Sequence, residues 1–309
     1  MIFWIVLIVF CCVWIPPALR NKERYKLNEV NRSEAPGQFV ELTHGAVHYE
    51  LTGNPDGPLV VLVHGFSAPS YMWDKNVPAL VEAGYRVLRF DLYGRGYSAR
   101  PSTKYDTQLF VDQIQSLTSK VVGEQPFHIV GLSMGGAITS AFISQFPSKI
   151  LSVIYLAPFN KPIDIGPLVN PIIGQWLGYT FFIPSLAKNQ LNDLVQPELQ
   201  PDWVSKFERQ MQFKGFRRAI ISSGRHVINK DPTLNYEQVG KFEIEKLLLW
   251  GTSDKVITID DAPRVQRLLG EHTNLVVLKD AGHVLQYEHY TEVNSAMIEH
   301  LNHVSSKGV

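Results

Sequence analysis

The sequence has 309 residues, of which 45% are apolar and 19% charged, an ordinary composition for a globular protein with a sizeable core. Its 29 basic and 29 acidic side chains cancel, and no long block of one sign occurs, which argues against a nucleic-acid-binding surface. The cysteines, Cys11 and Cys12, are adjacent, so the sequence predicts neither a disulfide framework nor a cysteine metal site.

Residues 1–19 carry no charged side chain, and as a helix they would extend roughly 28 Å, close to the thickness of a membrane hydrocarbon core. We predict a retained single-pass membrane anchor here. The alternative is a cleaved signal peptide, but the basic n-region and small-residue cleavage site are missing. Basic residues in 20–26 then predict a catalytic domain on the cytoplasmic face. Asn31-Arg32-Ser33 matches an N-glycosylation acceptor, which would be modified only if this part of the chain were on the lumenal side.

From about Gln38 onward, short apolar runs alternate with longer segments of helical period, which is typical of a mostly parallel sheet with helices on both faces. The eight predicted strands are 38–44, 46–53, 59–65, 85–92, 127–133, 150–157, 245–251 and 274–280. The predicted helices are 71–83, 107–122, 134–145, 262–269 and 287–301. The runs 59–63 and 247–250 are apolar enough for burial on both faces. The fold class is therefore α/β.

One segment breaks this alternation, because residues 160–239 show helical patterns and prolines but no clear strand. We interpret 160–239 as a helical cap inserted into the α/β core. The predicted organisation begins with an anchor at 1–19 and a basic linker at 20–37. The first core part at 38–159, the cap at 160–239 and the second core part at 240–304 follow. Within the cap, the apolar run 165–187 offers candidate acyl-pocket residues Trp176, Phe181 and Phe182.

A serine lies between two glycines where the strand 127–133 gives way to a helix. Gly131, Ser133 and Gly135 form the G-x-S-x-G pattern of a nucleophile elbow, in which small neighbours permit a sharp turn that exposes the hydroxyl. The pattern occurs by chance in about one chain in ten of this length, so a plain glycine-rich turn remains open until other residues support it.

Two backbone N–H groups are candidates for an oxyanion hole. The strand 59–65 ends at His64-Gly65-Phe66, where the flexible Gly65 lets the Phe66 N–H turn toward a reacting carbonyl beside the Met134 N–H. His64 is interpreted as a residue that stabilises this turn. The glycine-rich turn 91–98 lacks a phosphate-loop pattern and is predicted to shape the mouth of the site.

An acid and a base follow the candidate nucleophile at the ends of later strands, where open α/β sheets keep their sites. Asp254 follows the strand 245–251, and His283 follows the strand 274–280 after a glycine. His283 would take the proton of Ser133, and Asp254 would fix the imidazole tautomer. Three other aspartates are alternative acids: Asp260, Asp261 and Asp280.

These motifs together resemble the α/β-hydrolase superfamily over residues 38–304. Within it, the stretches HGFSAPSYMW and PFHIVGLSMGG behind an N-terminal apolar segment are similar to the membrane-anchored monoacylglycerol lipases. The resemblance implies hydrolysis of acylglycerol esters with no metal and no organic cofactor. Epoxide and haloalkane hydrolases of the superfamily use an aspartate at the elbow, so Ser133 disfavours those reactions.

The sequence therefore predicts a serine hydrolase that cleaves carboxylic esters with apolar acyl chains, of monoacylglycerol type. Its predicted partners are a small lipid or ester substrate and a membrane. A small-molecule esterase and a C–C bond hydrolase are the alternatives within the superfamily. A receptor or scaffold that retains the fold without catalysis is the alternative outside enzymes. The oligomeric state is left open by the sequence.

Overall fold

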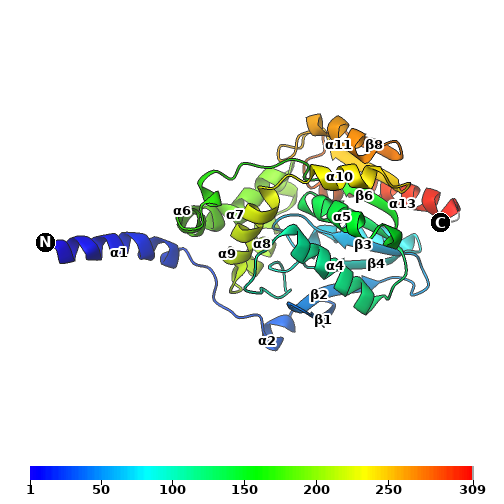
Figure 1. The fold of residues 1–309 in the computed structure, drawn as a ribbon. Coiled ribbons are helices and arrows are strands. Elements are labelled where there is room, and N and C mark those ends of the chain that lie inside the picture. The colour runs from blue at the N-terminus through cyan, green and yellow to red at the C-terminus, as the bar shows by residue number, and fades with distance from the viewer. Residues whose placement is uncertain (308–309) are drawn as a thin grey trace.

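The computed structural model describes residues 1–307 and is built on one eight-stranded sheet in the order β1-β2-β4-β3-β5-β6-β7-β8 (Figure 1). The strands are β1 Gln38–Leu42, β2 Gly45–Thr52, β3 Leu59–Val63, β4 Arg86–Phe90, β5 Phe127–Leu132, β6 Ile150–Leu156, β7 Glu245–Gly251 and β8 Thr273–Leu278. Each strand begins within one residue of the start of a predicted run. The fold class predicted from the apolar alternation is confirmed.

Parallel pairing joins six of these strands, from β4 through β3, β5, β6 and β7 to β8, whereas β1 and β2 are antiparallel additions at one edge. All five residues of β3 are buried, and so are Leu247–Trp250 of β7, because helices cover both faces there. In such a sheet the carboxyl ends of the parallel strands meet at one edge, and this is where polar side chains can gather.

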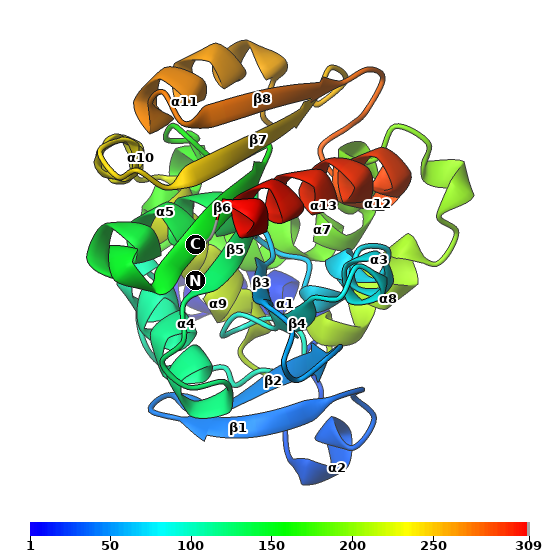
Figure 2. The same ribbon diagram turned by 90° about the vertical axis from the view of Figure 1, so that its right-hand side faces the viewer.

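Two helical layers sandwich the sheet (Figure 2). One layer contains α4 Thr107–Val121, α5 Met134–Gln145, α10 Thr233–Gly240 and α11 Ala262–Leu269, with consecutive members in contact. The other contains α3 Val77–Glu82, α12 Leu285–Glu288 and α13 Tyr290–Ser306, and α13 contacts β6 and β7. Short helical turns complete the core at η1 Ser70–Trp73, η2 Pro147–Lys149 and η8 Ile259–Asp261, and α2 Glu29–Arg32 precedes β1.

A second group of short helices lies between β6 and β7 at the carboxyl edge of the sheet (Figure 1). Its elements are η3 Gly166–Val169, α6 Ile173–Leu177, η4 Gly178–Phe182, α7 Ile183–Asn189, η5 Gln190–Asp193, η6 Pro197–Leu199, α8 Trp203–Met211, α9 Phe216–Ser223 and η7 Gly224–Ile228. We call these elements the cap. α10, which falls inside the predicted cap range, instead packs on α5 and α11 of the core.

The apolar N-terminal run forms α1, Ile2–Leu19, which projects away from the core (Figure 1). Within residues 1–307, no helix combines the length and the apolar character that crossing a membrane requires. The 18 residues of α1 reach only about 27 Å, and Pro16 and Pro17 occupy its last turn. The predicted single-pass anchor, and the cytoplasmic orientation inferred from it, are therefore wrong.

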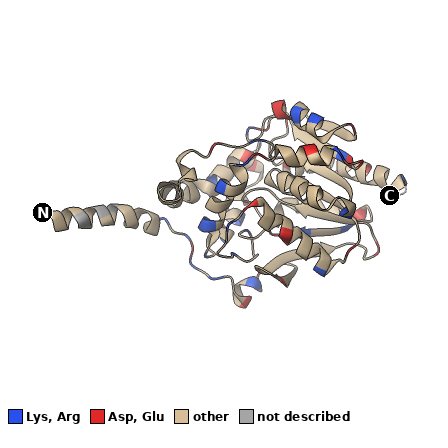
Figure 3. Ribbon diagram, viewed as in Figure 1, with Lys and Arg blue, Asp and Glu red and all other residues tan. Residues whose placement is uncertain are grey.

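The C-terminal half of α1 contacts the cap. The Trp176 indole N–H donates to the Val13 carbonyl, Arg217 donates to the Pro17 carbonyl at 3.1 Å, and Arg20 donates to the Thr180 carbonyl at 3.2 Å. Beyond α1, basic and acidic residues are interspersed over core and cap (Figure 3).

Candidate active site

Ser133 forms a strained turn between β5 and α5. Its φ of 52° and ψ of −119° are unusual for a residue with a side chain, and such strain is common at functional turns. The turn needs small neighbours, because a Cβ on Gly131 would lie 2.7 Å from the Gly136 Cα and one on Gly135 would lie 2.3 Å from the Val63 oxygen. The geometry is that of the elbow expected from the G-x-S-x-G spacing.

His283 and Asp254 form a buried hydrogen-bonded pair at the carboxyl ends of β8 and β7. The His283 Nδ1 lies 2.8 Å from Asp254 Oδ2, and the other carboxylate oxygen, Oδ1, accepts the backbone N–H groups of Val256 and Ile257 at 2.8 and 2.9 Å. A carboxylate can only accept, so Nδ1 carries the proton and Nε2 is left with a free lone pair. This tautomer is the one that a general base requires.

The electrostatics of the pair favour a basic imidazole. Burial by itself would lower the pKa of His283, but the charge of Asp254, their hydrogen bond and the charge of Asp193 outweigh it, so the pKa is raised above the ordinary histidine value. At neutral pH the ring is therefore a stronger proton acceptor than an exposed histidine.

A cavity of about 250 Å³ is lined by both Ser133 and His283, by Gly65 and Phe66 of the core and by Phe182 of the cap. A Cβ on Gly65 would lie 3.4 Å from the Ser133 Cβ, which shows how closely this backbone passes the serine. The structure thus brings the predicted nucleophile, base and oxyanion loop to one cavity, at the edge where the parallel strands end.

The two predicted oxyanion donors are backbone groups beside Ser133. Met134 is the first residue of α5, and N–H groups in the first turn of a helix have no partner within that helix. The Phe66 N–H belongs to the peptide whose carbonyl, Gly65 O, lies 2.9 Å from His64 Nδ1. Because the C=O and N–H of a trans peptide point in opposite directions, His64 sets the direction of the Phe66 N–H.

Two of the three aromatic candidates lie outside the cavity. Phe182 lines it, but Trp176 and Phe181 pack edge-to-face on each other at a centroid distance of 5.9 Å. Trp176 donates to the Val13 carbonyl of α1, and Phe181 is 52% exposed with the guanidinium of Arg20 over its ring. Consecutive residues of a helix point in different directions, so Phe181 and Phe182 cannot share one surface.

The alternative acids point elsewhere. Asp280 is exposed in a left-handed turn, where its N–H binds the Thr252 hydroxyl, and Asp261 forms an ion pair with Lys161 at 2.8 Å. Asp260 precedes α11 in η8 and is absent from the residues that line the cavity. Asp254 is the aspartate hydrogen-bonded to His283.

The cap also contributes polar residues that sequence reasoning missed. Asn189, Gln190 and Asp193 line the cavity with Ser133. Burial raises the pKa of Asp193 to about 6, with the nearby His283 opposing and Asp254 adding to this rise. The cap pattern contained no strand end or motif that could have indicated these positions. Within residues 1–307, no group of three or more histidine, cysteine, aspartate or glutamate side chains is placed to hold a metal ion.

Comparison with known proteins decides the family. Residues 58–290 match the model of the alpha/beta hydrolase fold family, which is most of the chain. The chain belongs to the α/β-hydrolase family. It is 25% identical to epoxide hydrolase A of Mycobacterium tuberculosis over 316 residues, covering 86% of this chain and 98% of the relative.

Solved structures share the fold of this α/β-hydrolase. A thermophilic esterase from Thermogutta terrifontis superimposes with a TM-score of 0.73 at 21% identity, covering 87% of this chain and 99% of the esterase. The enol-lactonase from Burkholderia xenovorans gives a TM-score of 0.75 at 18% identity, and the match covers 86% of this chain and 100% of the lactonase. A meta-cleavage product hydrolase gives a TM-score of 0.71 at 22% identity, and the match covers 86% of this chain and 98% of that hydrolase.

Proposed function

We propose that this α/β-hydrolase is a serine hydrolase that cleaves carboxylic esters of apolar acyl chains. The observation that carries the proposal is the hydrogen-bonded His283–Asp254 pair in the cavity that also holds the strained Ser133. A serine at a strained turn, in one cavity with a histidine that is protonated on Nδ1, is the arrangement that activates a hydroxyl for attack.

The chemistry follows from the roles of these groups. His283 Nε2 accepts the proton of Ser133 Oγ as the oxygen attacks the ester carbonyl, and Asp254 stabilises the imidazolium that forms. The Phe66 and Met134 N–H groups stabilise the tetrahedral oxyanion. His283 then protonates the leaving alcohol, and water releases the acid from the acyl-serine by the same steps.

The walls of the cavity suggest which parts of an ester they accept. Phe182 and Leu186 of the cap with Met72 and Val284 of the core are apolar and suit an acyl chain, whereas a polar end of the cap formed by Asn189, Gln190 and Asp193 suits hydroxyl groups. An apolar acyl chain on a polyhydroxy alcohol, as in a monoacylglycerol, has both parts. We therefore propose monoacylglycerol-type esters as the substrate class.

The test of the catalytic proposal is labelling with a fluorophosphonate, which reacts with an activated serine. We expect the wild-type protein to be labelled on Ser133 and Ser133→Ala to be unlabelled. Ester turnover by the variant should fall on the order of a million-fold, as in other serine hydrolases that lose the nucleophile.

Thermal unfolding of Ser133→Ala provides the control, since the hydroxyl contributes little packing and the variant should remain folded. A folded wild-type protein that is not labelled would contradict the proposal and favour a receptor or scaffold. Labelling combined with turnover of small or C–C substrates, and none of acylglycerols, would retain Ser133 but reject the substrate class.

A further inference from the structure

Three successive carbonyl groups of the loop beside Ser133 are each bound by a different side chain. We call residues 65–67 the oxyanion loop. Gly65 O is bound by His64 Nδ1 at 2.9 Å, Phe66 O by the guanidinium of Arg95 at 2.8 and 2.6 Å, and Ser67 O by the amide of Gln210 at 2.9 Å. His64 and Arg95 belong to the core, whereas Gln210 belongs to the cap helix α8.

The two core side chains are held in the states that these bonds require. The Leu92 N–H donates to His64 Nε2 at 2.9 Å, so Nδ1 must carry the proton that binds Gly65 O. Burial lowers the pKa of His64 to about 4, which keeps the ring neutral. Burial also lowers the pKa of Arg95 to about 9, which leaves the guanidinium charged at neutral pH.

Gln210 is unusual for its position in α8. It lies on the buried stripe of the helix with Trp203, Phe207 and Met211, where an apolar residue would ordinarily pack. A buried amide is costly unless both of its ends are bonded. Here the amide nitrogen donates to Ser67 O, and the amide oxygen accepts the Gly96 N–H at 3.0 Å.

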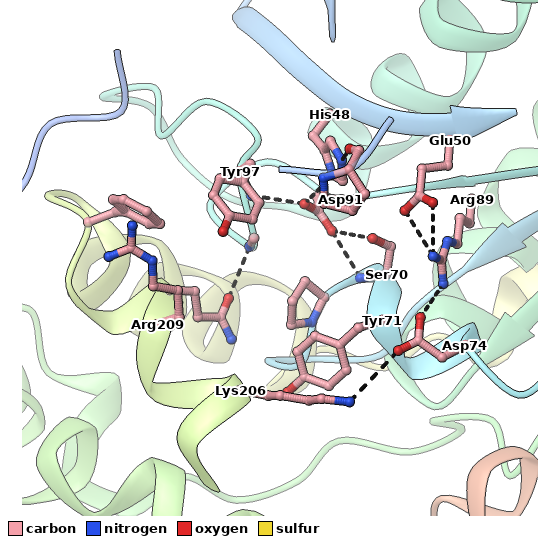
Figure 4. A pocket seen from close by; sticks show the side chains of 15 residues that line it. His48, Glu50, Ser70, Tyr71, Asp74, Arg89, Asp91, Tyr97, Lys206 and Arg209 are labelled. Atoms are coloured by element: carbon pink, nitrogen blue, oxygen red, sulfur yellow. Dashed lines mark hydrogen bonds and ion pairs between the residues drawn. The ribbon is translucent and has the colours of Figure 1, made fainter. Parts of the chain in front are cut away.

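The space on one side of α8 is open. A cavity of about 300 Å³ is lined by Lys206 and Arg209 of α8 and by Ser70, Asp91 and Tyr97 of the core (Figure 4). Gln210 also borders the cavity, and its hydrogen bonds join α8 to the core together with the Trp203–Tyr71 ring contact at 6.2 Å and the Lys206–Asp74 ion pair at 4.0 Å.

We infer that Gln210 is a positioning residue through which the cap holds the oxyanion loop in its reactive geometry. It bridges the Ser67 carbonyl and the Gly96 N–H, and so joins α8 to both the oxyanion loop and the glycine-rich turn 91–98. The oxyanion site is then complete only when α8 is seated on the core. This inference rests on the proposed function, since it needs Ser133 to form an oxyanion intermediate.

Gln210→Met tests the inference, because methionine has a similar size but cannot bind Ser67 or Gly96. We expect kcat for ester hydrolysis, per site titrated with fluorophosphonate, to fall about tenfold to a hundredfold, as displacement of reacting groups by an ångström can do. KM should change little. Affinity for a trifluoromethyl ketone, whose serine adduct carries an oxyanion, should fall in parallel with kcat/KM.

Gln212→Met is the matched control, since Gln212 follows α8 and its side chain contacts Arg209, not the oxyanion loop. It should leave kcat and ketone affinity unchanged. Gln210→Glu retains an acceptor for Gly96 but cannot donate to Ser67 O, so it should show the same loss of kcat if Gln210→Met does not fold.

A lower melting temperature with unchanged kcat and ketone affinity would overturn the positioning role and leave only a structural one. Wild-type protein that does not react with fluorophosphonate would instead contradict the proposed function itself. The two failures are therefore distinguishable.

Discussion

A single carboxylate decides which imidazole nitrogen of His283 is free to act. Asp254 Oδ2 accepts a hydrogen bond from His283 Nδ1 at an N–O distance of 2.8 Å, and Oδ1 accepts two backbone N–H groups. Asparagine at this position could turn its NH₂ group toward Nδ1 and favour the wrong tautomer. We expect Asp254→Asn to lower kcat roughly ten-thousand-fold, measured on a soluble ester.

Asp280→Asn is the control for this prediction. Asp280 is exposed and lies in a left-handed turn that asparagine tolerates, so turnover should remain near the wild-type value. If Asp280→Asn were the damaging change and Asp254→Asn the mild one, the acid would have been assigned to the wrong residue.

At the scale of elements, the cap turn η5 brings a second carboxylate to His283, the proposed general base. Asp193 lines the cavity with His283 and helps to raise its pKa, with Asp254 the other acidic group facing the ring. Only neutral His283 can accept the serine proton, so a raised pKa places the acid limb of kcat/KM above the ordinary histidine value of about 6.5.

Asp193→Asn removes one of these two negative charges. The pKa of His283 should then fall, and the acid limb of kcat/KM should move to lower pH by an amount that a pH profile resolves. Melting temperature and fluorophosphonate labelling at pH 8 should remain close to wild type. An unmoved acid limb would show that Asp193 does not influence the protonation of His283.

The elements of the core could be predicted because local pattern and tertiary environment agree. α5 and α11 begin and end at the predicted residues, and every predicted strand is present. The predicted helix 71–83 is instead η1 followed by α3, because Pro78 breaks a continuous helix and lies in the first turn of α3. The hydrogen bond from Asn76 to Asn294 across the core, by contrast, joins residues far apart in the chain and has no trace in local periodicity.

At the scale of the whole molecule, the sequence locates the strand-end residues but not the direction of cap side chains. Ser133, Asp254 and His283 follow parallel strands, and parallel strands of one sheet must end at the same edge. Gln210 and Asp193 meet the core through the docking of the whole cap, which local sequence does not encode. The same docking places Phe181 against Arg20 and Trp176 and Phe182 in the wall of the cavity.

This difference between adjacent phenylalanines supports a prediction about acyl specificity. Each methylene moved from water into an apolar pocket contributes about 0.8 kcal/mol, so four buried methylenes could raise kcat/KM roughly two hundred-fold over an acetyl ester. The cavity of about 250 Å³ is at the small end of ligand sites, so the gain should level off at medium chain length.

Phe182→Ser should flatten this dependence on chain length, because it places a hydroxyl in the apolar wall, while acetyl ester turnover changes less. Phe181→Ser makes the same chemical change on a side chain that is 52% exposed and lies under the Arg20 guanidinium, outside the cavity, so it should preserve the preference. The measurement is kcat/KM for acetyl to decanoyl esters of one alcohol below micelle formation. A constant value across the wild-type series would contradict the apolar acyl pocket and favour a small-molecule esterase or C–C bond hydrolase.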